Sequence, residues 1–118
     1  MAWTNAAMVV AADALRGAAI GAQLHTAAAG GSGTSNVAGS SRVAVSWSAA
    51  TSDGDFGLSS SLNFTGGSAS GAVYSVTLWS NSSSGGTFYG EFVLTGDATF
   101  NASGEYTVTT LNFNGSAS

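Results

Sequence analysis

Apolar residues recur at helical spacing only near the start of the chain. Met8, Ala12, Leu15 and Ala19 follow the i, i+4, i+7, i+11 spacing of one helix face. This pattern predicts a helix over residues 4–17. Because most of its side chains are alanine, the helix buries little surface by itself, and we expect it to lie closely against a larger apolar surface.

Polar and glycine residues mark the predicted ends of this helix. Thr4 or Asn5 can accept a hydrogen bond from a free N–H group of the first turn, and Gly17 suits the left-handed position that follows a helix. Asp13 and Arg16 have the spacing of neighbours on a helix surface and predict an ion pair there.

From residue 18 the hydrophobic period changes to two. Ile20, Ala22 and Leu24 share one parity and predict a first strand over residues 18–26. Residues 27–41 are rich in Gly, Ser and Ala, which predicts a long, flexible polar loop.

Alternating runs continue through residues 42–118. Val43, Val45 and Trp47 fall on one face, as in a half-buried strand. Residues 72–80 are apolar on both parities, which is typical of a strand covered on both sides at the centre of a sheet.

The stretch LWSNSSSGGTFYG, residues 78–90, predicts a hairpin. Leu78 and Trp79 close a buried strand, the Ser- and Gly-rich residues form the turn, and Phe88 and Tyr89 re-enter the core opposite them.

Two further parity patterns shape the C-terminal part. Phe88, Phe92 and Leu94 share one parity and predict a common face. The last run changes phase between Val108 and Leu111, and a β-bulge near residues 109–110 would restore one face.

These runs predict a mainly β fold, a small antiparallel β-sandwich of about six or seven strands preceded by one N-terminal α-helix. Residues 1–118 form one domain on this interpretation, with the sandwich over residues 42–118. The chain has no proline, so its sheet edges lack that protection, and a neighbouring subunit that covers them would explain this.

Composition excludes several classes of function. The 118 residues include no cysteine, and Arg16 and Arg42 are the only cationic side chains apart from one histidine, for a net charge of −4. Nucleic acid and anionic membrane surfaces are therefore not expected partners. Because neither a secretion signal nor an apolar span is recognisable, we expect the chain to stay where it is made until it is incorporated elsewhere.

Residues with catalytic or metal-binding chemistry occur without a supporting pattern. His25 is the single imidazole, and residues 52–55 (SDGD) begin like a calcium loop but lack its later ligands. Glu91 and Glu105 could form a glycosidase pair, and residues 30–36 (GGSGTSN) resemble an anion cradle without its lysine. We expect no catalytic residues, no metal and no cofactor.

Four aromatic residues, Trp47, Trp79, Phe88 and Tyr89, permit two interpretations. They could stack on a carbohydrate as a binding platform. Their alternating strand positions favour burial in the core instead.

The order of segments resembles a known family. An alanine-rich helix leads to LHTAAAGGSGTSN, then RVAVSW, and finally LWS followed by GGTFYG. Over roughly residues 3–113, this resembles small virion proteins of tailed bacteriophages, described as tail-fibre-like, minor tail or head-decoration proteins.

The resemblance implies a non-enzymatic structural protein located in the virion and assembled in the bacterial host cytoplasm. The expected role is an accessory capsid subunit (decoration or minor capsid) that stabilises the particle by binding the major protein lattice. The alternative is a minor tail or tail-fibre protein that binds a host receptor or glycan. Partners would be the major capsid protein or tail proteins, with a trimer as the expected homo-oligomer. The expected contact residues are Trp3, Met8, Leu15, Gly30, Gly31 and Asn36.

Overall fold

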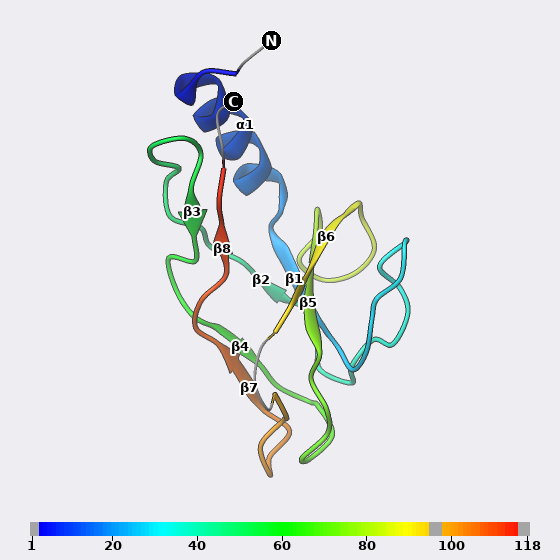
Figure 1. Ribbon diagram of the computed structural model, residues 1–118. Helices are drawn as coiled ribbons and strands as arrows, with labels where there is room; N and C mark the ends of the chain where they lie inside the picture. Colours follow the sequence, from blue (N-terminus) through cyan, green and yellow to red (C-terminus); the bar gives the residue numbers. More distant parts are fainter. Residues whose placement is uncertain (1–2, 95–97, 116–118) are drawn as a thin grey trace.

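The computed structural model describes residues 3–94 and 98–115 (Figure 1). Within them the chain is mainly β, with one N-terminal helix followed by antiparallel strands, as predicted. In chain order the elements are α1 (Asn5–Ala18), β1 (Gly21–His25), β2 (Val43–Ala44), β3 (Phe56–Gly57), β4 (Leu62–Phe64), β5 (Ser75–Trp79), β6 (Phe88–Val93), β7 (Tyr106–Val108) and β8 (Asn112–Phe113).

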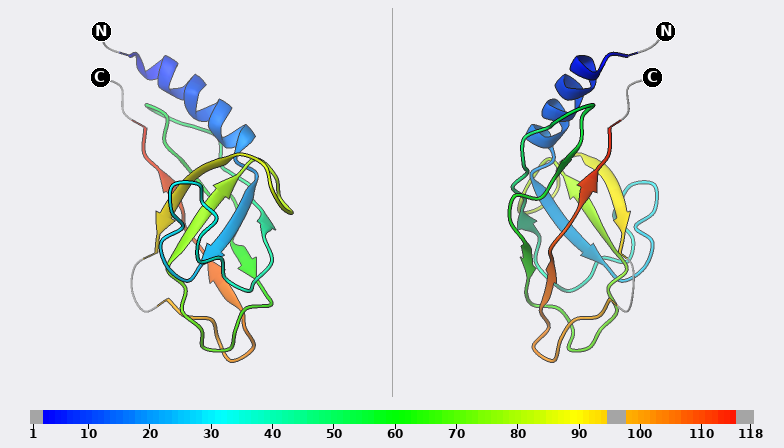
Figure 2. Two further views of the ribbon diagram at one scale, coloured as in Figure 1. Left: turned by 90° about the vertical axis from the view of Figure 1, so that its right-hand side faces the viewer. Right: turned by 60° about the vertical axis from the view of Figure 1, so that its left-hand side comes forward.

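The strands form two layers (Figure 2). One layer is a four-stranded sheet of order β2-β1-β5-β6, and the other consists of the pairs β3-β8 and β4-β7. This arrangement is compatible with a small β-sandwich. The described residues contain eight strands, more than the predicted six or seven, because the last run is divided into β7 and β8 and the short strand β3 is separate from β4. The predicted bulge near residues 109–110 is a break between β7 and β8.

The core lies between the two layers. Alternation turns Leu24 of β1 and Val76 of β5 inward, where they meet Phe64 of β4 and Val108 of β7. β5 is buried along its whole length and lies between β1 and β6, which confirms the prediction of a central strand.

α1 begins and ends close to the predicted residues. The Thr4 hydroxyl accepts a hydrogen bond from the Ala7 N–H at 3.1 Å, and Arg16 pairs with Asp13 at 2.7 Å, both as predicted. The prediction for Gly17 was wrong. Gly17 lies inside the last helical turn, and Ala19 caps the helix by donating to the Leu15 carbonyl at 2.8 Å.

α1 projects from one end of the β layers, and the molecule measures 48 × 24 × 22 Å (Figure 2). Within the described residues, no helix is long and apolar enough to cross a membrane.

Candidate functional site

Polar side chains gather on the outer face of the four-stranded sheet, the face turned away from the core. His25 of β1 lies opposite Ser75 of β5, and Thr77 of β5 lies opposite Glu91 of β6. Since successive strand residues point to opposite faces, the same alternation that buries Val76 in the core places these four side chains together outside it.

His25 is fully buried and uses both ring nitrogens internally. Nδ1 lies 2.8 Å from the Ser35 carbonyl oxygen, and Nε2 lies 2.8 Å from the Thr77 hydroxyl oxygen. Because a carbonyl only accepts, Nδ1 carries a proton and donates it to Ser35. Trp79 Nε1 donates to the Thr77 hydroxyl at 2.8 Å. The imidazole therefore ties the loop to the sheet.

Glu91 forms a second connection between the loop and the sheet. Its carboxylate accepts hydrogen bonds from the Ser75 hydroxyl and from the Ala29 N–H, the latter at 3.0 Å. The Ser75 bond, helped by the Ala29 bond, lowers the pKa of Glu91 even though partial burial acts in the opposite direction.

Glu105, the other half of the possible glycosidase pair, has separate partners. It is exposed just before β7 and accepts from the Asn101 side-chain amide at 3.3 Å. The structure gives the two carboxylates no common partner.

Residues 52–55, which begin like a calcium loop, form a turn in which Asp55 accepts from the Gly115 N–H at 2.9 Å. No cluster of three or more His, Asp or Glu side chains suited to a metal ion occurs in residues 3–94 and 98–115.

The loop of residues 27–41 lies over the outer face of the sheet (Figure 2, left). It has no regular strand, as predicted, but it is packed and not a free segment. Ala29 and Ala38 are buried, and Gly33 lies so close to the Phe88 ring that a Cβ atom there would meet it at 2.6 Å. Gly30, Gly31 and Asn36, the predicted contact residues, are exposed on this loop.

The four candidate platform aromatics divide between two places. Trp79 is buried against Phe88, with ring centroids 5.3 Å apart, and the Arg42 guanidinium stacks over Trp79 at 4.5 Å. Phe88 lies on the outer face, opposite to its predicted face, because the β5–β6 register shifts beside Trp79. Trp47 and Tyr89 lie elsewhere, beside the foot of α1, so the four rings do not form one platform.

An apolar pocket of about 120 Å³ lies at the foot of α1. Leu15 and Trp47 line it with Tyr89, which is 42% exposed, contrary to the prediction that it enters the core. Phe56 and Phe113 complete the wall as a stacked pair with centroids 4.9 Å apart. The pocket is smaller than ordinary small-molecule sites of roughly 300–1,000 Å³, and it suits a single apolar side chain.

The two most exposed large apolar side chains of the described chain are Val10 of α1 and Trp3, which lies just before the helix. Trp3 is 61% exposed and Val10 is 70% exposed, and Ala12 is the one helix residue that is buried. Of the other predicted contacts, Leu15 is half-buried and packs on the core, whereas Met8 is half-buried with its carbonyl beside Gly54.

Comparison with protein-family models, with curated proteins and with solved structures gives no match. The candidate surfaces therefore rest on geometry. One sequence pattern indicated the outer face of the four-stranded sheet. In β1, polar Gln23 and His25 alternate with apolar Ala22 and Leu24.

Proposed function

We propose that this chain is a non-enzymatic structural subunit of a tailed-phage virion, most simply an accessory capsid protein that docks on the major protein lattice through α1. The family resemblance supports a location in the virion, and the exposure of α1 supports this helix as the element that docks. The single observation that carries the proposal is an apolar helix with only Ala12 buried.

Trp3 is exposed just before α1, and the outward face of the helix itself, formed by Ala6, Val10, Ala14 and Gly17, is uncharged and exposed. These residues recur at intervals of three and four, so they form one stripe along the helix. An apolar helix face is normally buried, and here the β layers cover only the side of α1 that contains Ala12. The outward face thus has the composition of a buried surface without an internal partner.

Small side chains suit this face to close packing against another protein. Alanine and glycine allow a helix to approach a neighbour closely, and Trp3 provides a large side chain of the type enriched in interfaces. Docking would bury no charged group of this stripe. Since the subunit would bind the assembled lattice and not its dissociated parts, it would stabilise the particle by mass action. A symmetric trimer is the proposed oligomer.

A charge placed in the stripe tests the proposal. Val10→Asp should reduce incorporation of the protein into particles by about tenfold or more, because docking would bury an unpaired carboxylate. Ser103→Asp adds the same charge at the opposite end of the molecule and should leave incorporation unchanged. The measurement is the amount of each variant that cosediments with particles produced by a phage lacking the gene. Equal incorporation of both variants would contradict docking through α1.

The alternative is a minor tail or tail-fibre protein that binds a host receptor or glycan. The exposed Tyr89 ring beside the apolar pocket favours it. A glycan array that shows binding by the natural chain and its loss in Tyr89→Ala would favour the tail role over the capsid role.

A further inference from the structure

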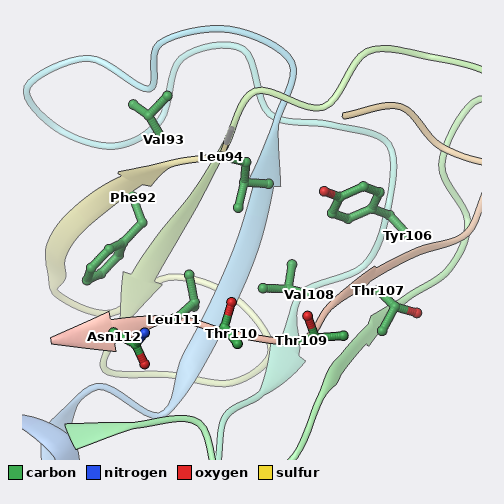
Figure 3. Close-up of a pocket in the computed structure, with 10 residues that line it drawn as sticks. All are labelled: Phe92, Val93, Leu94, Tyr106, Thr107, Val108, Thr109, Thr110, Leu111 and Asn112. Atoms are coloured by element: carbon green, nitrogen blue, oxygen red, sulfur yellow. The ribbon is translucent and has the colours of Figure 1, made fainter. Parts of the chain in front are cut away.

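A groove of about 370 Å³ opens along one side of the molecule, where the two layers are not joined (Figure 3). One wall is the end of β6, with Phe92 and Val93, together with Leu94 just after it. The other wall is the stretch Tyr106–Asn112 from β7 to β8. Its volume lies within the range of ordinary ligand sites.

Both walls are free strand edges. β6 is the last strand in the order β2-β1-β5-β6, β7 pairs with β4, and β8 pairs with β3. In the part of the chain that the structure describes, no strand pairing joins β6 to β7 or β8. A strand edge presents a row of backbone N–H and C=O groups that can bond to another strand.

The phase of the β5–β6 ladder identifies the groups that point into the groove. The Leu94 N–H donates to the Tyr74 carbonyl at 2.9 Å, so Leu94 bonds toward β5. In an antiparallel pair only every second residue bonds to the same neighbour. Phe92 therefore also bonds toward β5, and the backbone groups of Glu91 and Val93 point to the free edge.

The side chains between the walls are apolar and incompletely covered. In Figure 3 Phe92 and Leu94 point from β6 toward Leu111 and Val108 on the other wall. Phe92, Leu94 and Tyr106 are only half-buried, whereas Val108 and Leu111 are buried. None of the ten lining residues is charged. A segment that lies in the groove would complete the burial of these rings and methyl groups.

The β6 edge also lacks two of the devices that commonly prevent strand pairing. Proteins protect free edges with proline, lysine or inward-pointing charges, and this chain contains neither proline nor lysine. Val93 at this edge is 56% exposed. An edge without proline or lysine, with a second free edge facing it, has the features of an acceptor for an added strand.

We propose that the groove accepts an extended, uncharged segment of another protein, which pairs with β6 and with the β7–β8 edge as an additional strand. Main-chain hydrogen bonds would provide most of the affinity, and apolar side chains on alternate residues of the segment would contact Phe92, Leu94 and Tyr106. This site is separate from the outward face of α1 and does not depend on the proposed docking through the helix.

A tethered strand tests the proposal in the full chain. A segment of alternating valine and threonine, joined after Ser118 by a Gly/Ser linker, has a high effective concentration at the groove. Hydrogen exchange at the Glu91 and Val93 amides should slow by about tenfold or more, because both gain a bonded partner. The Phe92 and Leu94 amides, already bonded to β5, should change less. The midpoint of thermal unfolding should rise by several degrees.

Two controls separate strand pairing from a general effect of the fusion. The same tether with prolines in its segment should give no protection, since proline cannot donate to a ladder. Val93→Pro in the acceptor should remove the protection at Glu91, yet leave the fold intact because the Val93 N–H makes no bond to β5. Thr110→Lys, which places a charge on the other wall, should weaken the effect without touching β6.

Unchanged exchange at Glu91 and Val93, or equal protection by the proline tether, would overturn the proposal. So would an untethered chain that sediments as an oligomer with these two amides already protected, because a second copy would then fill the groove. Val10→Asp should not alter the tether effect, so failure of helix docking and failure of strand docking give different results.

Discussion

The loop of residues 27–41 and α1 both consist mainly of small residues, yet the loop is held against the sheet and α1 is largely exposed. The loop, which looked like a free segment in the sequence, is fixed to the sheet through His25 and Glu91. α1, which was expected to lie against a large apolar surface, buries only Ala12.

The comparison shows that hydrogen bonds to the sheet, added to the packing of Ala29 and Ala38, distinguish the loop from α1. The loop supplies the Ser35 carbonyl and the Ala29 N–H to buried polar partners on the sheet, and leaving those partners unpaired would cost free energy. α1 satisfies its own backbone and requires no such partner. Its outward face is therefore available to another protein.

The largest expected effect comes from His25. His25→Ala should lower the free energy of unfolding by about 3–5 kcal/mol, because it leaves a cavity beneath the loop and removes the partner of the Ser35 carbonyl. Urea denaturation measures the loss. Trp3→Ala removes a larger ring from the exposed segment just before α1 and should cost less than about 0.5 kcal/mol. Similar losses for the two variants would mean that α1 is held as firmly as the loop.

Gly33 should give the next largest effect. Its φ is +73° and a Cβ atom would meet the Phe88 ring at 2.6 Å, so Gly33→Ala should lower the free energy of unfolding by about 2–3 kcal/mol. A Cβ atom on Gly31 would meet nothing within 4 Å, and the φ of Gly31 is not positive. Gly31→Ala is thus a matched control in the same loop, and it should change stability by less than about 0.5 kcal/mol. If Gly33→Ala is equally neutral, the loop does not pack on Phe88.

The strands and their alternation could be predicted from the sequence, but the covering of the outer face could not. Ala22, Leu24 and Val76 show the period of two that places a strand against a core. The loop bonds at Ala29 and Ser35 use backbone groups, which every residue type carries, so composition gives no indication of them. The face of Phe88 depends on a register shift beside Trp79 that parity alone cannot reveal.

The groove between β6 and β7–β8 could not be predicted from the sequence either. The sequence shows where strands occur but not which edges remain unpaired, because pairing depends on contacts between distant residues. The absence of proline indicated only that some edge is unprotected.

A smaller effect should come from Glu91, whose carboxylate bonds to the loop. The stability that this bond gives should depend on pH. The pKa of Glu91 is lowered from 4.5 in the folded chain, so the carboxylate stabilises the fold above the pKa of the unfolded chain. This contribution should be lost as the pH falls from about 4.5 through the lower folded pKa. Glu91→Gln should cost about 1 kcal/mol at neutral pH and little in acid, where the natural chain has lost the same contribution.

Urea denaturation of the natural chain, Glu91→Gln and Glu105→Gln across acidic pH gives the measurement. Glu105 bonds only to Asn101 in its own turn and makes no bond to the loop, so its variant should follow the natural profile. A constant difference between Glu91→Gln and the natural chain at every pH would show that the ionised carboxylate is not what holds the loop.

Val10→Asp should have the smallest effect on the stability of the free chain, although we expect it to reduce incorporation into particles strongly. Val10 is 70% exposed, so Val10→Asp should change the free energy of unfolding by less than about 0.5 kcal/mol and leave the loop intact. Thermal unfolding of the free chain, compared with that of Ser103→Asp, checks this. Because the isolated molecule gains nothing from an apolar Val10, the lost incorporation can then be assigned to the surface that Val10 presents and not to unfolding. A marked loss of stability in Val10→Asp would instead place Val10 in an internal contact, and the outward face of α1 would no longer be free for a partner.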